Sequence, residues 1–144
     1  MIEQDTIKLL RQCDAGVKMG IDSIEDVIDY VSNPKLRSYL NQSKDEHNKL
    51  HKKIQQLLDE YNDEGKDPSP MAKGMSWIKT NLKLTLNESD ETIADLMTDG
   101  CDMGVKSLNK YLNEYQAADE KSKAIAKELI RLEDYLGKHI REFL

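Results

Sequence analysis

Apolar residues recur at the helical period along four long segments of this chain, and the connections between the segments differ sharply in length. The segments span about residues 5–32, 34–62, 88–115 and 119–144. Connections of about two to five residues join the first segment to the second and the third to the fourth, whereas about 25 residues, 63–87, separate the second from the third. Because no alternation of β-branched residues is sustained anywhere, the pattern predicts an all-α fold.

The unequal connections also predict a topology. An up-down-up-down bundle needs only a short second loop, whereas a chain that returns along a helix of about 40 Å needs a long one, as in ferritin-like bundles. We therefore expect a ferritin-like antiparallel four-helix bundle with a long crossover between its second and third helices. Residues 1–144 would form a single domain, made of a hairpin (5–62), a crossover (63–87) and a second hairpin (88–144).

Local signals mark the ends of these helices. The Asn33-Pro34 pair ends the first helix and begins the second, because proline is favoured in a first helical turn and disfavours a helical residue before it. Ser89 or Asp90 is the expected N-cap of the third helix. In the crossover, Trp77 could pack on the bundle or form a recognition surface. It shares a short amphipathic stretch with Met71, Met75 and Ile78.

Glycines form a matched pattern within the first and third helices. Gly16 and Gly20 recur as Gly100 and Gly104, at an offset of 84 residues, although an offset of 88 also aligns part of the sequence. The second and fourth helices align at an offset of 86. The chain therefore reads as an internal repeat of two related helical hairpins.

Glycine inside a helix costs about 0.5 to 1 kcal/mol relative to alanine, so these four positions need a compensating role. In a bundle with the predicted crossover, the first and third helices lie side by side and antiparallel. We expect Gly16, Gly20, Gly100 and Gly104 to permit close backbone contact between those two helices.

Several short stretches carry a resemblance to a known family. They are residues 9–16 (LLRQCDAG), 33–36 (NPKL), 77–79 (WIK), 99–102 (DGCD) and 139–141 (HIR). Together they resemble an uncharacterised bacterial family of ferritin-like four-helix-bundle domains. The resemblance implies the bundle fold with its long crossover and brings no assigned activity. Where that family tends to have a glutamate in the third helix, this chain has Asp99 and Asp102.

The histidines do not fit the usual di-metal site of a ferritin-like bundle. Such a site uses a Glu-x-x-His pair on each of two helices, but lysine, asparagine and leucine stand three residues before His47, His51 and His139. His47 and His51 have the spacing of paired zinc ligands, without a glutamate between them to act as a base. The sequence therefore lacks the standard motif.

His47 is nevertheless a candidate interior residue, because it lies on the apolar seam of its helix and the repeat places Glu133 at the equivalent point of the fourth helix. A buried polar group needs partners. Three interpretations stay open: a buried hydrogen bond or ion pair, partial exposure at the edge of the seam, and a non-standard metal site for iron, manganese or zinc. The ligand set of that site would be His47, Glu133, Asp14, Asp99 and Asp102.

The two cysteines, Cys13 and Cys101, are too few for a disulfide scaffold. In side-by-side antiparallel helices they would lie about 10 Å apart along the axis, beyond the reach of a disulfide. We expect buried free thiols.

Composition limits the classes of partner. A net charge of −6 argues against a nucleic acid or an anionic membrane surface, and no apolar run or signal-peptide pattern indicates export, so a cytoplasmic location is expected. No catalytic or cofactor-binding motif occurs. The sequence favours a non-catalytic bundle with a structural or interaction role, and the alternative is a metal-binding or oxidoreductase bundle. A homo-oligomer, a protein partner and a small-molecule ligand remain open.

Overall fold

Four long helices dominate the computed structural model, which describes residues 3–66, 78 and 89–144. They are α1 (Gln4–Val27), α2 (Pro34–Glu60), α4 (Asp90–Glu114) and α5 (Glu120–Ile140). Short 3₁₀ turns follow the first and last of them, η1 (Ile28–Tyr30) and η3 (Arg141–Phe143). Within the described ranges there is no strand, and the prediction of an all-α fold is confirmed.

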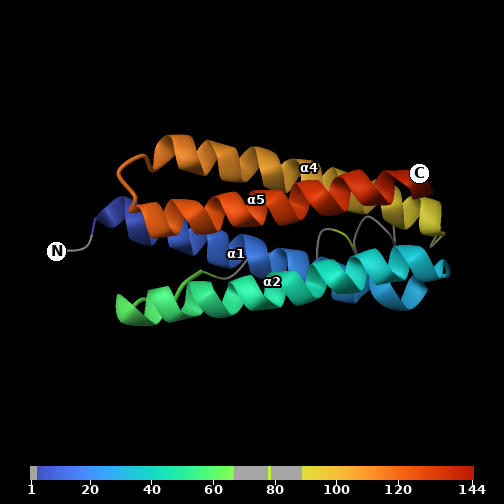
Figure 1. Ribbon diagram of the computed structural model, residues 1–144, viewed down its shortest axis with the longest axis horizontal. Helices are drawn as coiled ribbons and strands as arrows, with labels where there is room; N and C mark the ends of the chain where they lie inside the picture. The colour runs from blue at the N-terminus through green and yellow to red at the C-terminus, as the bar shows by residue number, and fades with distance from the viewer. Residues whose placement is uncertain (1–2, 67–77, 79–88) are drawn as a thin grey trace.

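The helices form a bundle whose direction pattern follows from the long second connection (Figure 1). Helices α1 and α5 run one way, and α2 and α4 run the other way, so α2 ends at the opposite end of the bundle from the start of α4. The Asp90 carboxylate accepts hydrogen bonds from the backbone amides of Ser32 and Asn33, which ties the start of α4 to the turn between α1 and α2. The predicted four-helix bundle with a long crossover is confirmed.

The predicted helix starts are also confirmed. The Asn33 side chain accepts hydrogen bonds from the backbone amides of Lys35 and Leu36, and proline occupies the first helical turn of α2. The Ser89 side chain caps α4 by accepting from the Thr92 amide. None of the described helices combines the length and the apolar character needed to cross a bilayer.

The buried apolar residues form two separate clusters, one toward each end of the bundle. The first cluster contains Ile24, Val27, Val31, Leu36, Leu40, Ile78, Ile93, Leu96, Met97, Cys101, Leu136 and Ile140. The second contains Leu9, Leu10, Cys13, Val17, Leu50, Ile54, Leu58, Leu108, Ala118, Ile125, Ala126 and Leu129.

Each helix changes from one cluster to the other at a glycine or a polar residue. Those positions are Gly20 on α1, His47 on α2, Gly104 on α4 and Glu133 on α5. A non-apolar layer therefore crosses the bundle between its two apolar clusters. Ile78 is buried in the first cluster, whereas Trp77, Met71 and Met75 lie outside the described residues.

Candidate functional site

A histidine and a glutamate from different hairpins meet in the middle layer of the bundle. The buried His47 ring places Nε2 at 2.9 Å from Oε1 of Glu133, and its Nδ1 lies 2.7 Å from the backbone carbonyl oxygen of Ser43. A carbonyl oxygen can only accept, so Nδ1 carries a proton, and one further proton lies between Nε2 and the carboxylate. The prediction that His47 and Glu133 both point inward is confirmed.

The environment of the pair favours the charged imidazolium. Burial alone would lower the pKa of His47, but the hydrogen bond and the negative charge of Glu133, together with the Ser43 carbonyl, raise it above its ordinary value. The pair is therefore an ion pair that links α2 to α5 across the interior.

The glycines of α1 and α4 make room for this pair. A Cβ atom added to Gly20 would lie 2.7 Å from Nε2 of His47, closer than real Cβ contacts allow. On the other hairpin, the nearest atoms to a Cβ at Gly104 belong to Glu133, at 3.5 Å. Gly20 therefore lies directly against the histidine ring, and Gly104 lies against the glutamate side chain.

Close backbone contact between the first and third helices is not the role that the structure gives these glycines. A Cβ at Gly16 would meet Leu129 of α5 at 3.4 Å, and a Cβ at Gly100 would meet no described atom within 4 Å. The nearest neighbours of Gly16, Gly20 and Gly104 are side chains of α2 and α5. All four glycines instead line a cavity of about 450 Å³ between α1 and α4. The predicted role of these glycines is therefore corrected: because the four residues have no side chains, they border a cavity between α1 and α4 and do not mark a tight contact between these two helices.

Gly20→Ala and Gly100→Ala are expected to have opposite effects on stability. Both substitutions relieve the helical cost of glycine, so Gly100→Ala should raise the free energy of unfolding by about 0.5 to 1 kcal/mol. Gly20→Ala should lower it by about 1 to 3 kcal/mol, because the new methyl group displaces the His47 ring. Denaturant unfolding of the two variants measures the difference, and equal effects would contradict the packing of His47 against Gly20.

The non-standard metal set is not assembled. Asp14 lies in a different layer of the bundle, beside His51. Asp99 and Asp102 are exposed, and Oδ1 of Asp102 lies 3.3 Å from Nη2 of Arg141. The described residues contain no group of three or more histidine, cysteine, aspartate or glutamate side chains arranged to hold a metal. Asp102 stands two residues before Gly104, so it lies about 200° away from Gly104 around the axis of α4. Its side chain therefore points away from the layer that holds His47 and Glu133. The five-residue metal site is therefore wrong.

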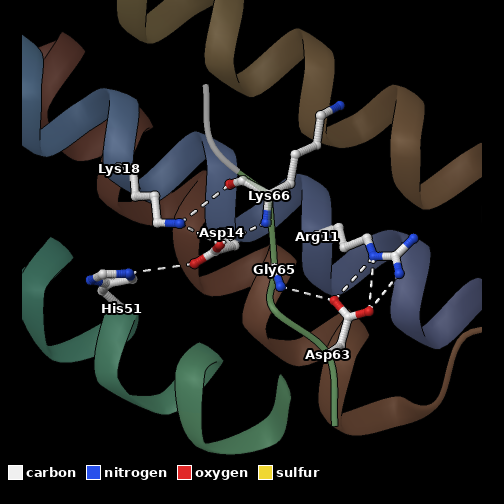
Figure 2. Close-up of polar contacts among 7 residues, drawn as sticks. All are labelled: Arg11, Asp14, Lys18, His51, Asp63, Gly65 and Lys66. Atoms are coloured by element: carbon white, nitrogen blue, oxygen red, sulfur yellow. Dashed lines mark hydrogen bonds and ion pairs between the residues drawn. The ribbon is translucent and has the colours of Figure 1, made fainter. Parts of the chain in front are cut away.

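Asp14 is instead the centre of a second buried polar cluster (Figure 2). Its Oδ2 accepts hydrogen bonds from Nζ of Lys18 at 2.8 Å and from the backbone amide of Lys66 at 3.0 Å. Its Oδ1 lies 3.4 Å from Nε2 of His51 on α2. The two histidines of the candidate zinc pair thus contact different carboxylates in different layers.

The same cluster includes the segment that follows α2 (Figure 2). Gly65 has a φ of +80°, and a Cβ there would lie 2.3 Å from Oδ2 of Asp14, so this position requires glycine on both counts. Asp63 accepts from the Gly65 amide and from Nε of Arg11, each at 3.0 Å. The hydrogen bond from Arg11 lowers the pKa of Asp63 below its ordinary value. Residues 63–66 are thereby fastened to α1, a contact that the sequence analysis did not predict for this start of the crossover.

Both cysteines are buried free thiols, as predicted. Burial, with a smaller contribution from the Asp14 charge, raises the pKa of Cys13 to about 12. Burial and the neighbouring Glu133 carboxylate also raise the pKa of Cys101. Thiols of this kind are poor nucleophiles, because the reactive form is the thiolate.

Comparison with solved structures supports the fold. The crystal structure of a DUF305 fragment from Deinococcus radiodurans is similar, with a TM-score of 0.75 and 12% sequence identity. The likeness covers 98% of this chain and 95% of that chain, and at such low identity it concerns the fold alone. No curated protein matches the sequence.

Comparison with protein families gives one match that extends over most of the chain. Residues 5–114 match the family described as domain of unknown function DUF2383. The expected resemblance to an uncharacterised domain family is thereby confirmed. The chain belongs to this DUF2383 family.

Proposed function

We propose that this protein is a non-catalytic, ferritin-like helical bundle with a structural or interaction role. The observation that carries the proposal is the use of the interior polar groups. His47 directs one ring nitrogen at Glu133 and the other at a backbone carbonyl, so neither is left over for a substrate or a metal. An ion pair of this kind fixes how two helices pack, and such buried polar groups can specify one arrangement of a bundle.

The second polar cluster supports the same role. Asp14 is fully buried, and its Oδ2 accepts hydrogen bonds from Lys18 and from the backbone amide of Lys66. Its Oδ1 lies 3.4 Å from Nε2 of His51 without a hydrogen bond, so the cluster brings together α1, α2 and the segment after α2. The two thiols have raised pKa values. The titratable groups of the interior thus act on one another and hold helices in place.

The internal repeat is part of this proposal, with an offset of 84 residues between α1 and α4. That offset aligns Gly20 with Gly104. Gly20 lies against His47, and Gly104 lies against Glu133. The offset of 86 aligns His47 with Glu133 themselves. Two related hairpins would then each supply one glycine and one half of the ion pair.

Metal content tests the proposal against a metal-dependent activity. The native chain is purified without an affinity tag or chelator, beside a His47→Ala variant, and iron, manganese and zinc are measured by elemental analysis. We expect much less than one metal ion per chain in both proteins, because His47 and Glu133 bind each other. One ion per chain in the native protein, lost in the variant, would overturn the proposal.

A further inference from the structure

The cavity between α1 and α4 has the size of a ligand site. Its volume of about 450 Å³ falls within the range of about 300 to 1,000 Å³ that is typical of pockets for small molecules. Helices α1 and α4 form its walls, and α5 and α2 contribute Leu129, Glu133, Leu136 and His47. The cavity therefore lies over the middle polar layer and is flanked by both apolar clusters.

Packing alone does not explain two of the glycines that line this cavity. Gly20 and Gly104 lie against His47 and Glu133, but a methyl group at Gly100 would contact no described atom within 4 Å. At Gly16 it would make only an ordinary contact with Leu129. Alanine at either position would be the more stable helical choice. The lack of a side chain at Gly16 and Gly100 keeps the cavity wide at these two positions.

The lining fits a molecule whose body is largely apolar. Met19, Met97 and Met103 all line the cavity, and flexible thioether side chains adapt to the shape of an apolar ligand. Met19 and Met103 remain 42% and 52% exposed, which places them at the mouth of the cavity. Leu129 and Leu136 lie deeper and are buried.

Two carboxylates, Asp22 and Glu133, and one lysine, Lys66, line the cavity. Of the two carboxylates, Glu133 is the one held in place by a buried partner, His47. Glu133 lines the cavity, keeps 13% of its side chain exposed, contacts His47 through Oε1 and also accepts a hydrogen bond from the Cys101 thiol. A carboxylate can accept about four hydrogen bonds, so capacity remains for a donor on a ligand. A hydroxyl group would be favoured there, and a carboxylate would be repelled.

We propose that the cavity between α1 and α4 binds a neutral small molecule with an apolar body and one hydroxyl group, which donates a hydrogen bond to Glu133. This goes beyond the structural role of the ion pair, because it uses the empty volume beside the pair. His47 holds the Glu133 carboxylate in position from the other side.

Three probes with the same two-ring body separate what the apolar body, a hydroxyl group and a negative charge each contribute to binding. They are naphthalene, 2-naphthol and 2-naphthoate. We expect 2-naphthol to bind the native protein at least about tenfold more tightly than 2-naphthoate, with naphthalene between them, because a hydrogen bond to a charged group replaces a charge repulsion. Fluorescence titration at neutral pH measures all three. Equal affinity for 2-naphthol and naphthalene would overturn the role of the hydroxyl, and no binding of any probe would overturn the site.

Two leucine substitutions on one helix locate the binding. Gly100→Leu should abolish binding of 2-naphthol and of naphthalene, because its side chain enters cavity space that no described atom occupies within 4 Å of a Cβ at this position. Asp99→Leu adds the same side chain at an exposed neighbouring position that does not line the cavity, and should leave both affinities unchanged. Circular dichroism checks that both variants are folded. Undiminished binding by a folded Gly100→Leu variant would place the probes elsewhere and contradict the proposal.

The contact with Glu133 needs its own variant. Glu133→Leu should lose the preference for 2-naphthol over naphthalene while still binding naphthalene. A metal found at His47 in the elemental analysis would overturn the structural role without affecting these titrations, so the two proposals can fail separately. A preference for 2-naphthol that survives in Glu133→Leu would contradict the proposed hydrogen bond.

Discussion

Replacing Asp14 with alanine is expected to lower the free energy of unfolding by about 3 kcal/mol, the largest effect of any single carboxylate in the described structure. The carboxylate is fully buried and accepts hydrogen bonds from Lys18 and from the Lys66 amide. Its removal leaves the Lys66 amide without its acceptor and loosens the segment after α2 at Lys66, while Arg11 of α1 still binds Asp63. Denaturant unfolding measures the loss, and faster hydrogen exchange of the Lys66 amide reports the release of the segment.

Asp102→Ala is the matched control for this prediction. Asp102 also has a basic partner, Arg141 at 3.3 Å, but both side chains are about half exposed. Exposed pairs contribute about 0 to 1 kcal/mol, so this variant should be nearly as stable as the native protein. If Asp14→Ala proved no more destabilising than Asp102→Ala, the buried cluster would not fasten the chain as described.

The second large effect is the pH dependence that His47 confers. Its pKa is raised in the folded protein, so the folded state binds this proton more tightly than the unfolded state does. The stabilisation is complete below the unfolded-state pKa of about 6.5 and is lost as the pH rises through the folded-state pKa. We expect the native protein to lose about 1 to 2 kcal/mol between pH 6 and pH 8, below the range in which unfolded-state thiols ionise, and His47→Leu to lack most of this loss.

The slope against pH is the informative quantity, because His47→Leu also leaves Glu133 without its partner and lowers stability at every pH. His139→Gln serves as the control, since His139 is partly exposed and its Nδ1 contacts the backbone carbonyl of Tyr135. That variant should keep the slope of the native protein. An unchanged slope in His47→Leu would show that His47 is not charged in the folded state.

Patterns that repeat along a helix were predictable from the sequence. The lengths of the connections gave the topology, and the seam position of His47 with its counterpart Glu133 gave the central pair. Both inferences use only the helical period and the order of the helices. They hold because the buried face of a long amphipathic helix is set by many residues at once.

The position of Asp14 was not predictable in the same way. It lies six residues before Gly20, which displaces it by about 9 Å along α1 from the level of His47. Because α2 runs antiparallel to α1, the neighbouring residue at that level is His51. The prediction that Asp14 points into the bundle was correct, but the prediction that it lies at the level of His47 was wrong. The level of a residue along the bundle depends on how the helices are aligned with one another along their axes.

Turn and cavity geometry also lay beyond the sequence reasoning. The positive φ of Gly65 and the contact between Asp63 and Arg11 depend on where the end of α2 meets α1. The glycine pattern was recognised, but small residues on facing helices are compatible with both close contact and open space. Only the positions of α2 and α5 decide between them, because their side chains fill the room beside Gly20 and Gly104.

A double-mutant cycle between His47 and Glu133 tests most directly whether the central pair holds the bundle together. Unfolding free energies are measured for the native protein, His47→Leu, Glu133→Leu and the double variant, at pH 6 and pH 9. We predict a coupling energy of about 1 to 3 kcal/mol at pH 6 that decreases at pH 9, with the double variant more stable than the sum of the single effects implies. Additive effects at both pH values would contradict the ion pair as the link between α2 and α5.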